Sequence, residues 1–136
     1  MNSAHDLGGR HGFGLVAPES EQSEPVFHTD WERKALALTL ATGFLGRWNI
    51  DESRHARESQ HPVDYLRQTY YENWLSGLEK LLVEKGLITE EDLKSGQAMS
   101  KTNEELLIRV LKAEKVQETI KKSSPSNLKI NTPPVF

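Results

Sequence analysis

The sequence predicts an all-α chain: an extended arm at the N-terminal end, a small domain of about five helices, and an extended C-terminal tail. First, helix-capping patterns recur along the middle of the chain, and apolar residues at helical spacing follow them. Second, no segment reads convincingly as a strand, because the alternating "LALTL" stands among alanines (Ala35, Ala37 and Ala41) and follows a helix cap. Third, a hydrophobic content of 36% and a mean hydropathy of −0.61 indicate that part of the chain is extended or buried only against a partner.

The arm is predicted over residues 1–28. This segment combines several glycines with Pro18, Pro25 and the acidic-polar run 19–24. Because glycine, proline and serine interrupt regular backbone, no helix or strand is expected there. Glycines also permit close backbone approach to another surface, and Phe13 would supply an apolar anchor.

The helical domain is predicted over residues 29–122. Thr29 opens a capping box, which starts a helix that runs to about Trp48. A second cap starts a polar helix over about 49–59. Pro62 then suits the first position of a short helical turn, since its fixed φ matches the helix and its missing N–H costs nothing there.

The longest helix is predicted from about Thr69 to Lys85, with Gly86 as its left-handed stop. A short helix follows the cap at Thr89, and a final helix is expected over 102–122. Residues 123–136 contain proline and serine breakers without periodicity, which indicates a linker or tail. The apolar face of the longest helix consists of Tyr71, Trp74, Leu75, Leu78, Leu81 and Leu82.

Charge and composition exclude several classes of protein. A net charge of −3 offers no electrostatic case for nucleic acid or an anionic membrane. No stretch of 18 apolar residues is present, and the N-terminus lacks the basic and apolar regions of a signal peptide. Without cysteine, the chain has no disulfide, thiolate nucleophile or cysteine-bound metal. A cytoplasmic protein is expected.

Two motifs in the arm fail as chemical sites. Residues 12–17 fit the letters of the dinucleotide fingerprint, but neither a preceding strand nor a following helix is predicted, and both are needed to hold the pyrophosphate. His5 and His11 lack a third metal ligand at a recognisable spacing. No pair of carboxylates or nucleophile motif suggests a self-sufficient active site.

Two clusters in the helical domain are open to more than one interpretation. Arg54 and Arg57 fall on the short polar helix, where an exposed face with local ion pairs, such as Arg54 with Glu58, is the simpler expectation. Tyr70 and Tyr71 start the longest helix beside Trp74, and such a cluster is more often part of a core than of a pocket. Since the two tyrosines lie on adjacent faces, one can pack inward while the other presents its hydroxyl to a groove.

Five motifs in order resemble the beginning of the nitrile hydratase beta subunit. They are "HDLGG" with the glycines after it, "EPVFHTDWE" (24–32), the Asp51, Glu52 and Arg54 pattern, "YL" (65–66) and "YYENWL" (70–75). The resemblance covers roughly residues 4–85. It implies an N-terminal arm and a helical domain, followed in the family by an SH3-like barrel that begins just after a "PP-x-F" segment.

No barrel is expected in this chain, because it ends at "NTPPVF". Either the sequence is a fragment, or the barrel belongs to a separate gamma chain, as three-subunit relatives such as thiocyanate hydrolase suggest. A beta subunit that is naturally divided into two chains is favoured, because the sequence starts with Met1. In the family, a second arginine that binds the oxidised cysteines lies in the barrel, and it would then come from the gamma chain.

The resemblance implies one subunit of a lyase that adds water to a small nitrile to give an amide. In the family, Co(III) or Fe(III) is bound by cysteines of the alpha subunit, so this chain would bind no cofactor. Arg54 matches an arginine that donates hydrogen bonds to oxidised cysteines, which suits a guanidinium fork. Tyr70, Trp74 and Ile50 match substrate-pocket positions. Ser53, like Thr39, replaces a bulky aromatic, which would widen the pocket or shift its wall to another subunit.

The resemblance also implies an interface with the alpha subunit. Alternative functions are a subunit of a thiocyanate-hydrolase-like enzyme and an accessory protein that assembles the alpha subunit. The metal, the preferred nitrile and the number of subunit copies stay open. Interface positions are expected at His5, Asp6, Gly8, Gly9, Phe13, Phe27, Trp31 and Tyr71.

Overall fold

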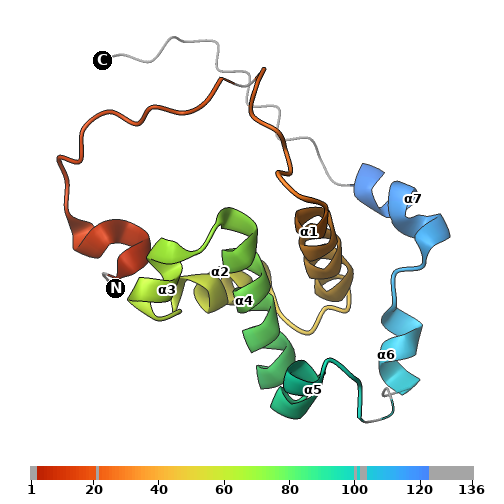
Figure 1. The fold of residues 1–136 in the computed structure, drawn as a ribbon. Coiled ribbons are helices and arrows are strands. Elements are labelled where there is room, and N and C mark those ends of the chain that lie inside the picture. Colours follow the sequence, from red (N-terminus) through yellow and green to blue (C-terminus); the bar gives the residue numbers. More distant parts are fainter. Residues whose placement is uncertain (1–2, 21, 100, 102–103, 123–136) are drawn as a thin grey trace.

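The computed structural model describes residues 3–20, 22–99, 101 and 104–122, and these residues form helices and connecting segments without a strand (Figure 1). The all-α prediction is confirmed for this part of the chain. None of its helices is long and apolar enough to cross a bilayer. In chain order the elements are η1 (Ala4–Gly9), α1 (Asp30–Gly43), α2 (Ile50–Glu58), α3 (Pro62–Arg67), α4 (Tyr70–Glu84), α5 (Glu90–Ser95), α6 (Glu104–Arg109), η2 (Ala113–Lys115) and α7 (Val116–Lys121).

Helix α4 organises the compact part, because both α1 and α2 pack against it (Figure 1). At the α2–α4 crossing, Gly77 lets the backbones come close: a β-carbon there would lie 2.5 Å from Arg57 Cγ and 3.2 Å from its backbone nitrogen. The apolar core is correspondingly small. Its buried members are Ala35, Ala56, Leu78 and Leu81.

The predicted helix starts at Asn49, Thr69 and Thr89 are confirmed by capping hydrogen bonds, whereas the start predicted at Thr102 lies outside the described residues. Asn49 and Glu52 cap each other, with 2.9 Å from Glu52 N to Asn49 Oδ1 and 2.8 Å from Asn49 N to Glu52 Oε2. The carboxylate of Glu72 accepts from Thr69 N at 2.7 Å. Such bonds satisfy N–H groups that the first turn leaves unpaired. Gly86 has φ +65°, as its predicted role as a helix stop requires.

The first long helix is shorter than predicted. It ends at Gly43 instead of Trp48, and a turn follows in which Leu45 N donates to the carbonyl of Thr42. Gly46 then has φ +66°, a left-handed conformation that a right-handed helix cannot pass through. The apolar pattern continues through this turn, which is why spacing alone extended the helix too far.

The final helix is also different from the prediction. Instead of one helix over 102–122, the described residues form α6, η2 and α7, with Lys112 extended at ψ 145°. Leu107 and Ile108 are 56% and 87% exposed. Short helices that are not buried against the rest of the fold are only marginally stable, so apolar residues at helical spacing do not suffice to form one continuous helix here.

The arm contains a 3-10 helix where irregular backbone was predicted. In η1, the Asp6 carboxylate accepts from Ser3 N at 2.8 Å and from Gly8 N at 3.0 Å. These bonds lower the pKa of Asp6, the bond from Ser3 most. Residues 10–20 have no helix, in line with the expected extended arm. The predicted tail 123–136 lies outside the described residues, and the division at residues 28 and 122 stays a prediction.

Candidate functional site

The arginine groove lies between α2, α3 and the first turns of α4. It has a volume of about 400 Å³ and contains three of the predicted site residues, Arg54, Tyr70 and Trp74. The Arg54 side chain is 61% exposed, and its Nη1 lies 3.6 Å from Asp51 Oδ1. The predicted pair with Glu58 is therefore wrong: Arg54 pairs within the first turns of its own helix, and its guanidinium stays open to a partner surface. The groove is completed by Arg57, Glu58, Tyr65, Gln68, Thr69 and Asn73.

The apolar pocket lies between the C-terminal half of α1 and the start of α2. Its volume is about 280 Å³, and it contains the other predicted pocket residues, Ile50 and Ser53, together with Thr39. Trp74 borders this pocket as well as the arginine groove. The substrate-pocket candidates therefore line two adjoining hollows that share the Trp74 indole. The pocket is completed by Leu40, Gly43, Phe44, Trp48, Asn49 and Arg57.

The two tyrosines at the start of α4 face different surroundings, as predicted. Tyr70 is 66% exposed, and its ring lies 5.6 Å from that of Trp74. Tyr71 is half-buried and lies 5.4 Å from the ring of Phe27. Loss of hydration raises the pKa of the Tyr71 hydroxyl, and the neighbouring Tyr70 and Glu32 raise it further. Of the two, Tyr70 is the more exposed and lines the arginine groove.

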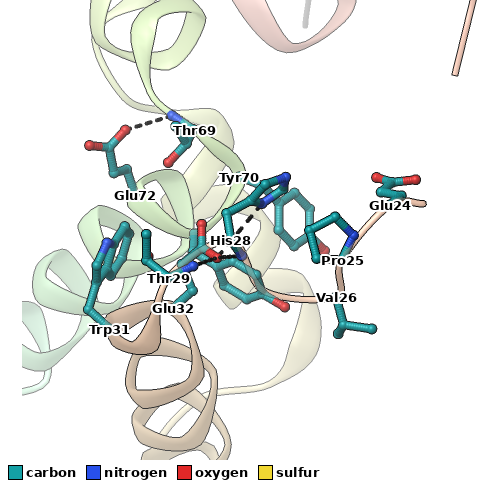
Figure 2. A pocket seen from close by; sticks show the side chains of 11 residues that line it. Glu24, Pro25, Val26, His28, Thr29, Trp31, Glu32, Thr69, Tyr70 and Glu72 are labelled. Atoms are coloured by element: carbon teal, nitrogen blue, oxygen red, sulfur yellow. Dashed lines mark hydrogen bonds and ion pairs between the residues drawn. The ribbon is translucent and has the colours of Figure 1, made fainter. Parts of the chain in front are cut away.

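A third hollow, the arm groove, lies between the segment before α1 and the first turn of α4 (Figure 2). Its volume is about 830 Å³, and three predicted interface residues belong to it or pack beside it: Phe27, Trp31 and Tyr71. Glu32 is 5% exposed there; its carboxylate accepts from the backbone N–H groups of His28 and Thr29, the latter at 3.1 Å. This buried carboxylate holds the end of the arm against the domain.

The other predicted interface residues lie on a separate part of the surface. His5, Asp6, Gly8 and Gly9 belong to η1, which packs against α3. Phe13 follows in the extended segment and is 66% exposed. The described chain thus divides the interface candidates between η1 and the arm groove, and leaves Phe13 without a packing surface.

Arg57 is the site residue that sequence reasoning did not select. It was expected on an exposed polar face, yet it is half-buried, with its guanidinium carbon 4.5 Å from the centre of the Trp74 ring. It lines both the arginine groove and the apolar pocket. No signal in the sequence links two residues 17 positions apart on different helices; only the helix crossing at Gly77 brings them together.

No metal centre is found among the described residues. The sequence has no cysteine, and the described residues hold no group of three or more histidines and carboxylates that could bind a metal ion. Paired or hydrogen-bonded carboxylates such as Glu52, which accepts from Lys85 Nζ at 2.5 Å, instead serve the fold. That bond lowers the pKa of Glu52.

The described residues thus form a helical module whose grooves are lined by arginine and aromatic side chains. They contain no group of side chains that could bind a metal ion. Comparison with known proteins gives this module a family: the chain matches the model "Nitrile hydratase beta subunit, N-terminal" over residues 1–124. The chain belongs to this family, which confirms the resemblance found in the sequence.

Individual relatives agree with this result. The nitrile hydratase beta subunit of Pseudomonas putida is 46% identical over 100 residues, which are 74% of this chain and 45% of the relative. The low-molecular weight cobalt-containing nitrile hydratase beta subunit of Rhodococcus rhodochrous is 43% identical over 68% of this chain and 40% of the relative. A cobalt-containing beta subunit from Pseudonocardia thermophila is 35% identical over 69% of the chain. The chain thus spans less than half the length of these relatives.

Proposed function

We propose that this chain is the helical part of the beta subunit of a heteromeric nitrile hydratase, a lyase that adds water to a nitrile to form an amide. The family match over residues 1–124 carries the proposal. The arginine groove supports it, because it brings Arg54, Tyr70 and Trp74 together around one hollow. Its wall is open, and a partner subunit would complete the site.

In this proposal, Arg54 donates hydrogen bonds to oxidised cysteine oxygens of an alpha subunit. The exposed guanidinium has several N–H donors in a planar fork and is paired only loosely with Asp51. Tyr70 and Trp74 border the substrate, while Ile50 and Ser53 shape the adjoining pocket. Since such outer contacts orient the ligands of a metal, they affect the reaction without touching the metal.

The metal belongs to the partner in this proposal, since the sequence has no cysteine and the described residues hold no set of ligands for it. Cobalt or iron in the alpha subunit is the expectation, and two relatives are named cobalt-containing. A separate gamma chain with the barrel, and with the second arginine, completes the proposed enzyme. We further propose a cytoplasmic location for the assembly.

The test is hydration of a nitrile by the assembled enzyme with Arg54→Lys or Arg54→Ala. We expect kcat/KM to fall by roughly 10- to 100-fold in both variants, because lysine lacks the guanidinium fork. Native mass measurement should show the same subunit ratio as in the wild type. Arg67→Lys is the matched control: Arg67 is 77% exposed on α3 and pairs with Asp64 at 3.1 Å.

Wild-type turnover by Arg54→Ala would remove the proposed role of Arg54. Thiocyanate is assayed beside the nitrile, and hydrolysis of thiocyanate alone would point to a thiocyanate-hydrolase-like enzyme. An active enzyme purified without this chain in stoichiometric amount would instead favour an assembly protein.

A further inference from the structure

Arg57 is held in one place by three different contacts. Its guanidinium lies over Trp74, with 4.5 Å between the central carbon and the ring centre. Its Nε donates to the carbonyl of Ser53 at 3.2 Å. Its aliphatic stem packs where Gly77 lacks a side chain. Stacking and a close-packed stem fix the orientation of the guanidinium, which reduces the entropy that binding a ligand would cost.

The charge of Arg57 is not matched by an acid within the described part of the chain. Arg54 and Arg67 each have a carboxylate within 4 Å, but no carboxylate oxygen of the described residues comes that close to Arg57. Glu58 lines the arginine groove with it but forms no ion pair with it. Because Nε is occupied by Ser53, the two terminal nitrogens carry the free donors of this side chain.

The apolar pocket is the hollow in which an anion would meet this cation without an acid beside it. Its walls are mostly apolar or aromatic, from Leu40, Phe44, Trp48, Ile50 and Trp74. Arg57 is the one charged residue among the described residues that line it, whereas Glu58 stands in the arginine groove. A hollow of about 280 Å³ suits a small molecule.

We infer that the apolar pocket binds a small carboxylate with an apolar body, and that Arg57 recognises its carboxylate. The terminal nitrogens of a guanidinium match two carboxylate oxygens in a planar, bidentate pair. The inference rests on the proposed function and specifies it: the substrates are nitriles that carry a carboxylate. Trp74 provides the wall against which both the guanidinium and the body of the ligand lie.

The first test compares two nitriles on the assembled enzyme, 4-cyanobenzoate and its neutral analogue 4-tolunitrile. In Arg57→Met, the ratio of kcat/KM for 4-cyanobenzoate to that for 4-tolunitrile should fall by about tenfold, since a partly solvated charge-assisted contact is lost. Methionine keeps an unbranched stem against Gly77. Arg57→Lys retains the positive charge, so the ratio should fall less than in Arg57→Met. Arg67→Met is the control, in which the ratio should equal that of the wild type.

The second test is independent of turnover. Titration of the full chain with 4-cyanobenzoate, followed by the indole NMR signals, should give binding that Arg57→Met weakens by about tenfold. Circular dichroism checks that the variants stay helical, and Arg57→Gln replaces the methionine variant if that one does not fold. An unchanged ratio and unchanged binding in a folded variant would overturn the inference. Lack of all nitrile hydration, with carboxylate binding intact, would overturn only the proposed function.

Discussion

Two arginines three residues apart on α2 have different surroundings and therefore different uses. Arg54 is exposed and paired with Asp51 of the same helix, so its guanidinium faces outward. Arg57 is half-buried and stacked on Trp74 of another helix. Surface ion pairs contribute little to stability, whereas a stacked and packed guanidinium is held in a defined orientation. The resemblance in sequence singles out Arg54 alone, and only the contacts single out Arg57.

The Asp92 carboxylate is expected to make the stability of the fold depend on pH. Its carboxylate accepts from Met99 N at 2.7 Å and from Thr89 N and Oγ1 at 2.8 Å each. These bonds lower the pKa of Asp92 below its ordinary value of 3.8, the bond from Met99 most. A lowered pKa means that the carboxylate stabilises the fold at neutral pH, and that this contribution is lost as the pH falls through the lowered pKa.

Asp92→Asn should therefore lower the melting temperature at neutral pH, because an amide has a single acceptor oxygen for these donors. The difference from the wild type should shrink in acid below the ordinary pKa of 3.8. Melting is followed by circular dichroism at both pH values. Glu91→Gln, an exposed neighbour on the same helix, should melt like the wild type. Equal melting of Asp92→Asn and wild type at neutral pH would contradict the assignment.

At the scale of elements, the crossing of α2 and α4 determines the shape of the site. The crossing is close because Gly77 faces the backbone and stem of Arg57. It places Trp74 one turn earlier on α4, where it borders both the arginine groove and the apolar pocket. Interhelical distance depends on the side chains at the contact, so a small residue here has consequences for both hollows.

Gly77→Ala tests this crossing. The new β-carbon would lie 2.5 Å from Arg57 Cγ and 3.2 Å from its backbone nitrogen, so the helices must separate. Overpacking costs about 1–3 kcal/mol, and the better helix propensity of alanine returns at most about 1 kcal/mol. We expect a net loss of roughly 1 kcal/mol in urea denaturation.

Gly43→Ala is the matched control, since nothing lies within 4 Å of a β-carbon at that helical position. It should leave the free energy of unfolding unchanged or raise it slightly through helix propensity. If Gly77→Ala proves as stable as Gly43→Ala, the close crossing does not constrain the fold.

At the scale of the whole molecule, much apolar surface is left outside the small core. In the arm, Leu15 and Val16 are 101% and 89% exposed, and Phe13 is 66% exposed. Figure 1 shows the arm running well away from the helices before it returns to α1. Contiguous exposed apolar side chains mark interaction surfaces. An arm of this kind is expected to gain its packing from a partner subunit.

Deletion of residues 1–14 tests the role of the arm. Since η1 packs mainly on α3 and residues 10–20 are exposed, the helices α1–α5 should keep their circular dichroism signal. Association with an alpha subunit should weaken, by roughly tenfold or more if Phe13 is buried in the complex. Binding is measured by titration of the purified subunits. Full affinity of the shortened chain would contradict the interface assignment.

The family and most helix starts could be predicted from the sequence because their signals are local. A capping box involves residues three positions apart, so Asn49 with Glu52 and Thr89 with Asp92 identify helix starts without any tertiary contact. The same local rules overextended α1 past Gly46 and joined α6 to α7, because apolar spacing does not show whether a face will be buried.

The all-α class, the order of the main helices and the family could all be predicted from the amino-acid sequence. The stacking of Arg57, rather than Arg54, on Trp74 became visible only in the folded chain, as did the place of Arg57 in the pocket that Ile50, Ser53 and Thr39 line. The difference arises because the two kinds of interaction join residues at different separations along the sequence. Capping depends on hydrogen bonds within one helical turn, whereas a pocket wall depends on how closely two helices cross. At this crossing the helices approach closely because Gly77 has no side chain.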